Sequence, residues 1–573
     1  YKDGIELCRY SSQAEKALTI RYIFDSLVNH CRSILDEETH FRVLITRATK
    51  KIKFILTHHH EGDEVVWISP YYLDYKYQFG YMIDFKFDVK RTQTFNRRIQ
   101  QLSLSLDNEY KSNRNLYFDK FEKIKEFAKN FYGSIFKNTI FDFGGFCQLP
   151  STALNGKRYV FAANQEDSFP STGLNKYGPF GKVDKPVIFY FLRFESEKDK
   201  AFKLYNALLG KEFPDNRFYK GLQQTYGLTI DQDNIKGLLA EKHQSSVAIE
   251  DAAQRLVDKH PNHQLVILAF SPRKEDEGNN KRRYLNIKYN FAQKQIPVQF
   301  VQYNTITNAY SLKAAIPNLA LAIFAKLGGK PWKVKPITDD CLVVGISQTV
   351  HRRPEKRIKK YVAYSVLLDT GGIYKSLEVL STEDEIGSHI DKLKERLFSV
   401  LKETDQKYKK IVLHVTYKLR RKELEAITQV LDRLDQNIEL VVLRINTEND
   451  FWGFDQSKSH LTPLKNQYIP LSETKYLIWL DGLNNQSEEP TKRYSGPVYA
   501  DFHYSNRELS RDDQHRYLQD LLNLSGANWR GLNAKAVPVS VYYCKLVSEY
   551  VKDFKEILDV DNLQSEFLNP WFL

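Results

Sequence analysis

The sequence predicts an α/β protein, in which a mixed α+β N-terminal region precedes two larger α/β regions. Three observations support this fold class: aromatic-rich strand patterns before residue 110, alternation of strand and helix patterns after Pro186, and a different element order after Trp332. With 573 residues, of which 42% are hydrophobic, the chain is long enough for three or four domains with separate cores.

The N-terminal region combines helical and extended patterns. Its expected elements are a helix at residues 11–35, strands at 65–75, 79–89 and 101–107, and a later helix at 117–136. Residues 101–107 are predicted to form a half-buried strand, because polar and apolar residues alternate there with period two.

From Pro186 onward, strand and helix patterns alternate regularly. The predicted strands are 187–194, 264–270 and 296–303, and the predicted helices are 196–209, 279–293 and 316–327. This alternation favours a parallel, doubly wound sheet. Ligands of such sheets bind at the carboxyl ends of the strands, which is where we expect Gln299 to lie.

After Trp332 the order of the patterns changes. We expect strands at 341–350, 361–369 and 373–380, a helix at 384–402, a strand at 410–416, a helix at 422–434 and a strand at 438–445. This order predicts a second α/β core in the C-terminal part of the chain.

Polar residues from three predicted elements of the middle region suit a common anion site. Tyr284 and Lys288 are four residues apart and share one face of a helix. Gln299 lies in an apolar strand, and Lys326 ends a helix that Gly328 terminates. Lysines supply point charges and an amide can bind phosphate or metal, so a phosphate with an attached base would fit. The alternative is a surface helix and a core glutamine with satisfied hydrogen bonds.

As an ordered set, Tyr284, Lys288, Gln299 and Lys326 resemble the guide 5'-phosphate pocket in the MID domain of the Argonaute family. Residues 325–332, Ala-Lys-Leu-Gly-Gly-Lys-Pro-Trp, resemble the junction between the MID and PIWI domains of that family. The resemblance implies that Tyr284 lies against the first guide base, while its hydroxyl and the other three residues hold the phosphate.

Two further residues are assigned by the same resemblance. Asn318 is expected to contact the next phosphate of the guide. In prokaryotic Argonautes with this pocket, a hydrophobic C-terminal residue enters between MID and PIWI, and Leu573 fits that role. Its carboxylate and Gln299 would then help to bind a divalent cation at the guide phosphate, and Mg²⁺ is the natural choice because it prefers oxygen ligands.

The resemblance also divides the chain into domains. Segments at 80–87 and 102–107 look like APAZ regions, the partners of short prokaryotic Argonautes, and too little chain remains between 110 and 180 for a PAZ domain. The expected domains are an N-terminal APAZ-like domain (1–110), a linker region (111–185), a Rossmann-like MID domain (186–335) and an RNase H-like PIWI domain (336–573).

The positions that match the catalytic carboxylates of the PIWI core hold other residues. They read Ser347, Thr416 and Lys545. Cleavage by this core needs acidic side chains that hold two divalent metal ions. Serine and threonine lack the negative charge and a lysine repels the ions, so we expect no catalytic residue and no target cleavage.

The charge of the chain favours a polyanionic partner. Its net charge is +13 and its pI is near 9.1. Residues 351–360 hold six Lys or Arg residues beside the degenerate centre, where nucleic-acid backbones would pass. Asn528, Trp529 and Arg530 could also face the guide near its 5' end.

The sequence therefore predicts a catalytically inactive prokaryotic Argonaute. By family resemblance its partners are a guide RNA (or DNA), a complementary target DNA and an effector, an NADase or a nuclease, in defence against plasmids and phages. Because the chain starts with Tyr1 and its only methionine is Met82, we expect the natural chain to begin earlier, and the effector could precede Tyr1 or be a separate subunit.

Two alternatives stay open from the sequence: an active guide-directed endonuclease with unconventional ligands, and a general RNA-binding protein that uses no guide. No apolar run approaches the roughly 20 residues of a membrane helix, and no signal peptide opens the chain. The five cysteines form no paired motif, which indicates a reducing compartment, so we expect a cytoplasmic protein without membrane contact.

Overall fold

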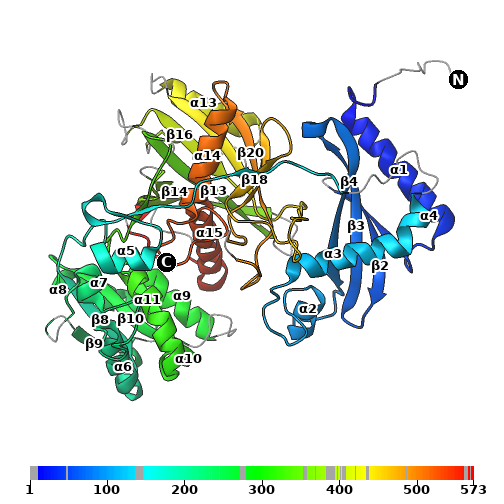
Figure 1. Cartoon of the computed structure of the whole chain (residues 1–573). Coiled ribbons are helices and arrows are strands. Elements are labelled where there is room, and N and C mark those ends of the chain that lie inside the picture. The colour runs from blue at the N-terminus through cyan, green and yellow to red at the C-terminus, as the bar shows by residue number, and fades with distance from the viewer. Residues whose placement is uncertain are drawn as a thin grey trace. The chain divides into compact units, whose positions relative to one another are not determined.

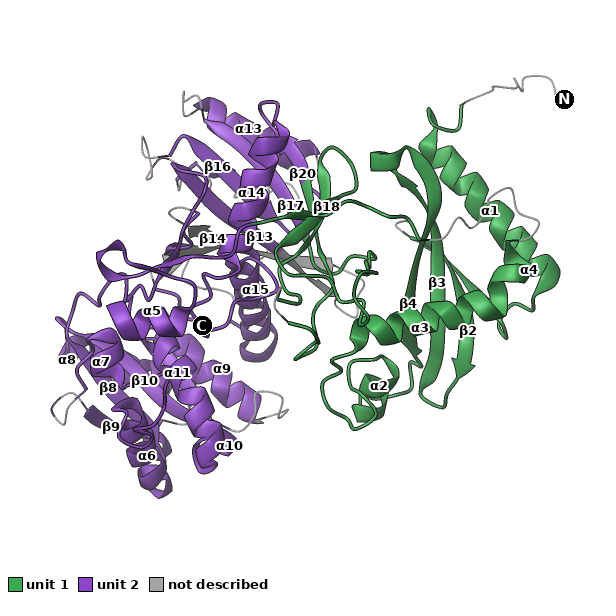
Figure 2. Cartoon of the chain, in the orientation of Figure 1, with its two compact units in different colours: residues 1–154, 446–501 green, residues 155–445, 502–573 purple. Residues whose placement is uncertain are grey.

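The computed structural model describes residues 11–573 except 47–48, 137–145, 231–232, 234, 244, 272–278, 353–357, 368–369, 382–390, 392–393, 396–397, 400–401, 403–407, 420, 434–437, 485–486, 561–565 and 568. The chain divides into two compact units (Figure 2). Unit 1 comprises Tyr1–Leu154 and Asn446–Asp501, and unit 2 comprises Asn155–Ile445 and Phe502–Leu573.

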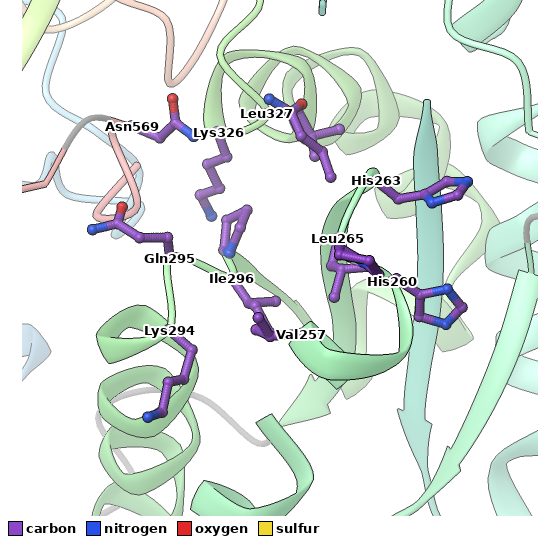
Figure 3. Close-up of a pocket in the computed structure, with 13 residues that line it drawn as sticks. Val257, His260, His263, Leu265, Lys294, Gln295, Ile296, Lys326, Leu327 and Asn569 are labelled. Carbon is purple, nitrogen blue, oxygen red and sulfur yellow. The ribbon is translucent and has the colours of Figure 1, made fainter. Parts of the chain in front are cut away.

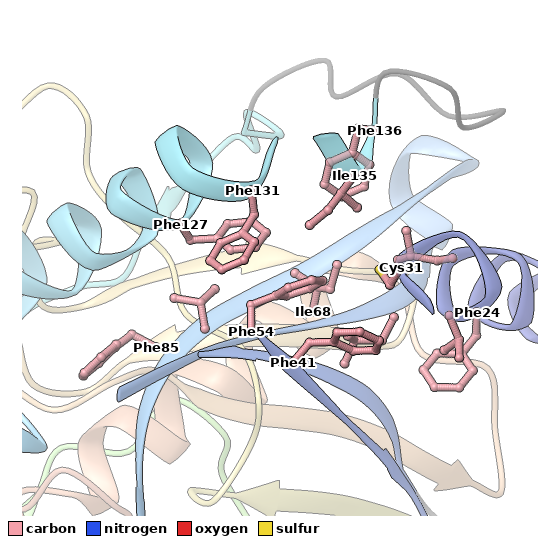
Figure 4. Close-up of a cluster of buried hydrophobic side chains, with 14 residues drawn as sticks. Phe24, Cys31, Phe41, Phe54, Ile68, Phe85, Phe127, Phe131, Ile135 and Phe136 are labelled. Atoms are coloured by element: carbon pink, nitrogen blue, oxygen red, sulfur yellow. The ribbon is translucent and has the colours of Figure 1, made fainter. Parts of the chain in front are cut away.

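Unit 1 contains an antiparallel sheet of four strands in chain order (Figure 1). Its strands are β1 (Phe41–Ile45), β2 (Lys50–His58), β3 (Gly62–Leu73) and β4 (Gln78–Val89). Helices α1 (Lys16–Ile34) and α3 (Leu116–Phe127) pack on one face through a phenylalanine-rich core (Figure 4). The Phe54 ring of β2 lies 5.1 Å from that of Phe127 and 5.4 Å from that of Phe131. The predicted first helix and both aromatic strands are confirmed.

The predicted strand at 101–107 is wrong. Helix α2 (Arg97–Leu102) occupies its first residues, and Leu104 follows in a turn with a φ of 59°. The Asn96 side chain accepts a hydrogen bond from Ile99 N and caps the helix, which buries Ile99 and Leu102 on one face. The period-two alternation was therefore overridden by a helix that starts upstream of it.

The second segment of unit 1 contains β18 (Gln467–Pro470), β19 (Lys475–Trp479) and the start of β20 (Val498–Ser505), and β5 (Thr152–Ala153) pairs with β18. Helix α3 is joined to this segment through Tyr117. Its hydroxyl donates to Ser495 O at 2.7 Å and accepts from Trp479 Nε1 at 3.2 Å.

Unit 2 contains the predicted parallel sheet, with strands in the order β11-β10-β8-β9. These are β8 (Val187–Arg193), β9 (Ile235–Leu239), β10 (Gln264–Ser271) and β11 (Val298–Gln302). Helices α8 (Ser246–Lys259) and α9 (Asn279–Gln293) share one core with alternate residues of the strands, whereas α6 (Lys198–Leu208) and α11 (Ala309–Lys326) contact each other. The α/β class and the parallel order are confirmed.

Helix α11 begins earlier than the predicted start at residue 316 and contains Pro317 in its interior. A proline has no N–H, so the carbonyl four residues earlier loses its helical partner. Here Asn216 Nδ2 donates to that carbonyl, Lys313 O, at 2.9 Å. The helix therefore continues through the proline, because a residue about a hundred positions away replaces the missing donor.

The second sheet of unit 2 places antiparallel β15-β14-β13 beside parallel β13-β16-β17. Its strands are β13 (Cys341–Arg352), β14 (Ile358–Leu367), β15 (Tyr374–Ser381), β16 (Lys410–Val415) and β17 (Glu439–Asn446). Helix α13 (Arg421–Arg433) packs on this sheet, and α15 (Val539–Leu558) crosses β13. An added Cβ at Gly345 would overlap the Ser540 carbonyl oxygen, so glycine permits this close approach.

These strands confirm the expected order of the C-terminal core. Most of the predicted helix at 384–402, and the side chains of the basic run at 351–360, lie outside the described residues. No helix in the described part of the chain has the length and apolar character needed to cross a membrane.

Candidate functional site

Tyr284 and Lys288 lie on α9, and both reach the same residue of α15. The Tyr550 hydroxyl lies 3.0 Å from the Tyr284 hydroxyl and accepts a 3.0 Å hydrogen bond from Lys288 Nζ. Lys288 is 3% exposed and Tyr550 5%. Burial raises the pKa of Tyr550, so its hydroxyl is protonated and neutral at physiological pH.

Lys326 and Gln299 form the second half of the site. Lys326, the last residue of α11, is 1% exposed and donates to Val298 O at 2.9 Å and to Gln299 Oε1 at 2.8 Å. Burial, with the positive charge of Arg530 as the smaller cause, lowers the pKa of Lys326 from 10.5 to about 7. The two oxygens that accept from this buried ammonium carry no net negative charge, so a nearby anion would stabilise its charged form.

The expected place of Gln299 in its strand is wrong. It is the second residue of β11, paired with Leu268 of β10, and not a residue of the carboxyl end. The strand begins late because Gln295 adopts a φ of 57° after α9 and Pro297 follows. The end of α11, and not the crevice beyond the carboxyl ends of the strands, therefore positions the amide.

Arg530 adds a third cation to this region. Its exposed guanidinium donates to the Tyr542 hydroxyl at 3.1 Å, and its charge acts on Tyr284, Tyr550 and Lys326. These electrostatic interactions place both halves of the site near one guanidinium.

The loop that carries Arg530 is anchored to the end of α11. Asn318 Oδ1, on α11, accepts from Leu532 N at 3.0 Å. Trp332 Nε1 donates to Gly526 O and Trp529 Nε1 donates to Trp332 O, each at 3.1 Å. Gly328 ends α11 with a φ of 84°. The predicted junction motif thus fixes Lys326 and Arg530 in one region.

The C-terminal tail, residues 569–573, forms part of the wall of the site. Trp571, Phe572 and Leu573 are buried. The Trp571 ring centroid lies 5.6 Å from Lys288 Nζ and 5.5 Å from the Tyr550 ring centroid. The tail is therefore docked beside the predicted phosphate ligands, whereas the metal-binding role of Leu573 stays a prediction.

A pocket of about 210 Å³ lies at the amino ends of β10 and β11, and the Lys326 side chain lines one part of it. Figure 3 shows that the Lys294 ammonium and the imidazoles of His260 and His263 point away from Lys326. These basic groups do not converge, so the pocket does not form a second cationic site.

The three positions expected for catalytic carboxylates lie around the middle of β13, at Gly345 to Ser347. Ser347 pairs with Ala363 of β14, and Thr416 N donates to Ile346 O at 3.4 Å. Lys545 follows Cys544, whose thiol donates to Gly345 O at 3.1 Å. The family resemblance placed these positions in one centre, and the backbone contacts bring them close, whereas the loss of cleavage stays a prediction.

Beneath this centre, His414 belongs to the core. Its Nδ1 lies 2.7 Å from Ser540 Oγ, and burial lowers its pKa to about 3, so the ring is neutral. Among the described residues, no group of three or more His, Cys, Asp or Glu side chains could hold a metal ion.

Tyr550 is the residue that sequence reasoning missed. It lies 262 positions from Lys288 and 266 from Tyr284, so no local spacing connects it with them. Arg530 had been noticed in its local motif, but its proximity to Lys326 depends on the fold.

Comparison with known proteins identifies the C-terminal region. Residues 276–556 match the Piwi domain family. A Piwi protein of Archaeoglobus fulgidus is 24% identical over 307 residues, which cover 48% of this chain and 69% of the relative. The argonaute protein of Cereibacter sphaeroides is 24% identical over 453 residues, which cover 70% of this chain but only 56% of the relative.

The fold agrees with these sequence matches. The structure of Clostridium butyricum Argonaute bound to a guide DNA and a 19-mer target DNA superimposes with a TM-score of 0.68 and 14% identity, covering 98% of this chain and 89% of that one. The chain therefore contains a Piwi domain within an Argonaute fold. The domain match and the two relatives agree with the Argonaute resemblance of the sequence, and the structural neighbour shows the same fold.

Proposed function

We propose that the chain binds a short guide oligonucleotide by its 5'-phosphate at Tyr284, Lys288, Gln299 and Lys326. The observation that carries this proposal is that the buried Lys326 ammonium donates to two neutral oxygens, Val298 O and Gln299 Oε1, in the region where Arg530 adds a further positive charge. Because buried charge is costly unless it is compensated, a phosphate dianion is a suitable ligand.

Two neighbouring groups would orient the guide. The Tyr284 ring lies 4.3 Å from the Phe300 ring, and its half-buried side chain leaves area on which the first base can stack. Asn318 uses its amide oxygen to anchor Leu532 N, so its NH₂ group would be the donor to the next phosphate.

A Mg²⁺ ion at the guide phosphate fits part of this donor set. The Leu573 carboxylate and Gln299 Oε1 would hold the ion, which would neutralise charge between two anions. Gln299 Oε1 already accepts from Lys326, but an amide oxygen has two lone pairs and can serve both partners.

We propose that target recognition occurs without cleavage. Ser347, Thr416 and Lys545 replace the carboxylates that two-metal chemistry requires. Recognition must then be passed to another polypeptide or domain, and the family resemblance favours an NADase or a nuclease in prokaryotic defence. The same resemblance favours an RNA guide and a DNA target, whereas the Clostridium butyricum relative was solved with a DNA guide.

The binding proposal is tested with labelled oligonucleotides that carry a 5'-phosphate or a 5'-hydroxyl. The double change Lys288→Ala with Lys326→Ala removes two charge-assisted contacts of about 1.5–3 kcal/mol each, so most 5'-phosphate binding should be lost. Lys313→Ala is the control, because this lysine lies on the same helix and pairs with Asp215. Equal binding by wild type and double variant would defeat the proposal.

The proposed absence of cleavage needs a separate assay. Loaded protein is incubated with labelled complementary target and Mg²⁺ or Mn²⁺, and the expected result is intact target. Specific cuts opposite the guide would show that other ligands hold the metals. Sequencing copurified nucleic acid would identify guide chemistry, and heterogeneous lengths without a 5'-phosphate would favour a general RNA-binding protein.

A further inference from the structure

We propose that Tyr550 of α15 is a positioning residue, which holds the Lys288 ammonium and the Tyr284 hydroxyl in the arrangement that selects a 5'-phosphate over a 5'-hydroxyl. This inference rests on the proposed function and extends it to a residue outside the expected phosphate-binding set. It follows from the geometry of one hydroxyl group with two partners.

The Tyr550 hydroxyl is bonded to both groups that the guide phosphate would use on α9. It accepts from Lys288 Nζ at 3.0 Å and lies 3.0 Å from the Tyr284 hydroxyl. Without this oxygen, a buried ammonium would lose an acceptor and would turn toward other partners. One oxygen therefore links the two groups and limits how far apart they can lie.

Three aromatic rings surround the same ammonium. Lys288 Nζ lies 4.2 Å from the ring centroid of Tyr550, 5.6 Å from that of Trp571 and 5.9 Å from that of Tyr284. The rings come from α15, the C-terminal tail and α9. Such a cage attracts a cation through the ring faces and limits the conformations of a flexible lysine.

Tyr550 can restrain Lys288 because its own position is fixed. Its ring stacks at 5.9 Å on Phe554 of the same helix and lies 5.5 Å from Trp571 of the tail. The Piwi helix and the tail thus position the tyrosine before any ligand arrives. Restraint before binding lowers the entropy cost of holding a ligand, and here it applies to the groups that would contact the terminal phosphate.

The decisive experiment measures a ratio of affinities. Tyr550→Phe keeps the ring and removes only the hydroxyl, so the preference for 5'-phosphate over 5'-hydroxyl oligonucleotides should fall about tenfold, while binding of the 5'-hydroxyl form changes little. Tyr517→Phe is the matched control, since its buried hydroxyl donates to Glu439 at 2.6 Å, and it should leave the ratio unchanged.

A double-mutant cycle separates positioning from general packing. In a Lys288→Met background, Tyr550→Phe should change the ratio much less than in the wild type, because the ammonium that it orients is absent and only the Tyr284 hydroxyl remains to be held. An unchanged ratio in folded Tyr550→Phe would overturn the proposal, and so would an equal loss of affinity for both oligonucleotides.

Two further outcomes are distinguishable. If the wild type shows no 5'-phosphate preference, the proposed function itself fails, and the inference falls with it. If Tyr550→Phe does not fold, Trp571→Leu alters the same cage from the tail. A smaller fall in the ratio is then expected, and no fall would overturn the proposal.

Discussion

Replacing Lys326 with methionine should strongly reduce the 5'-phosphate preference with little or no loss of stability in the guide-free protein. Methionine keeps an unbranched stem of similar length and removes the ammonium. That ammonium is 1% exposed and donates to two neutral oxygens, Val298 O and Gln299 Oε1. Function and stability are therefore expected to respond in different directions.

The magnitude follows from the lowered pKa. A fall from 10.5 to about 7, at about 1.36 kcal/mol per unit, corresponds to a cost on the order of 5 kcal/mol for the buried charge. The unfolded state binds more protons between these two values, so the cost is fully present below about pH 7 and declines as the pH rises toward 10.5.

Loss of the donor opposes this gain. The variant leaves Val298 O and Gln299 Oε1 without Lys326, at about 1–3 kcal/mol for each unsatisfied oxygen. The two effects nearly balance, with the net change ranging from slightly destabilising to about 3 kcal/mol stabilising. Differential scanning calorimetry at pH 6.5 should therefore show an unchanged or higher Tm, and any gain should shrink at pH 9.

Phosphate recognition should change much more clearly. Loss of one charge-assisted contact of about 1.5–3 kcal/mol weakens binding of a 5'-phosphorylated oligonucleotide by about 10- to 150-fold. Binding of a 5'-hydroxyl oligonucleotide serves as the internal control and should change little. A Tm several degrees lower at pH 6.5, or an intact preference for 5'-phosphate, would refute the reasoning.

Three further predictions concern proton linkage, the C-terminus and packing. A bound phosphate should raise the pKa of Lys326 from about 7, so the affinity for a 5'-phosphorylated oligonucleotide should fall as the pH rises above about 7, by at most tenfold per pH unit. Binding titrations at several pH values measure this slope, and the Lys326→Met variant should lack it. Deletion of Leu573 should weaken guide binding and remove its sensitivity to EDTA, measured by fluorescence anisotropy. Gly345→Ala should lower the Tm, because its methyl group would overlap the Ser540 carbonyl oxygen; an unchanged Tm would show that α15 can shift.

Elements with strong local patterns could be predicted from the sequence. Helix α9 has the predicted bounds, and β8 and β10 differ from their predictions by a single residue at the carboxyl end. The errors arose where a hydrogen bond from a side chain outside the local sequence pattern determined the backbone conformation. Asn96 capped a helix that displaced the predicted strand at 101–107, and Asn216 allowed α11 to continue through Pro317.

In the site, too, local sequence spacing predicted some features, whereas contacts between distant residues could not be predicted. The shared face of Tyr284 and Lys288 follows from four-residue spacing alone. The low pKa of Lys326 depends on burial and on Arg530, 204 positions later in the chain, and no local pattern encodes either cause. Tyr550 was missed for the same reason, because only packing of α15 brings it to α9.

Helix α15 links the two parts of the proposed function. Near its start, Ser540 contacts His414 and Cys544 contacts Gly345, beside the proposed inactive centre, while Tyr550 lies at the proposed phosphate pocket. These contacts involve a hydroxyl, a thiol and a phenol, and none depends on a metal-binding carboxylate. The proposed replacement of the carboxylates by Ser347, Thr416 and Lys545 would therefore remove cleavage while the helix stays in place. That is the physical condition for the proposed protein, which keeps its guide and leaves the target intact.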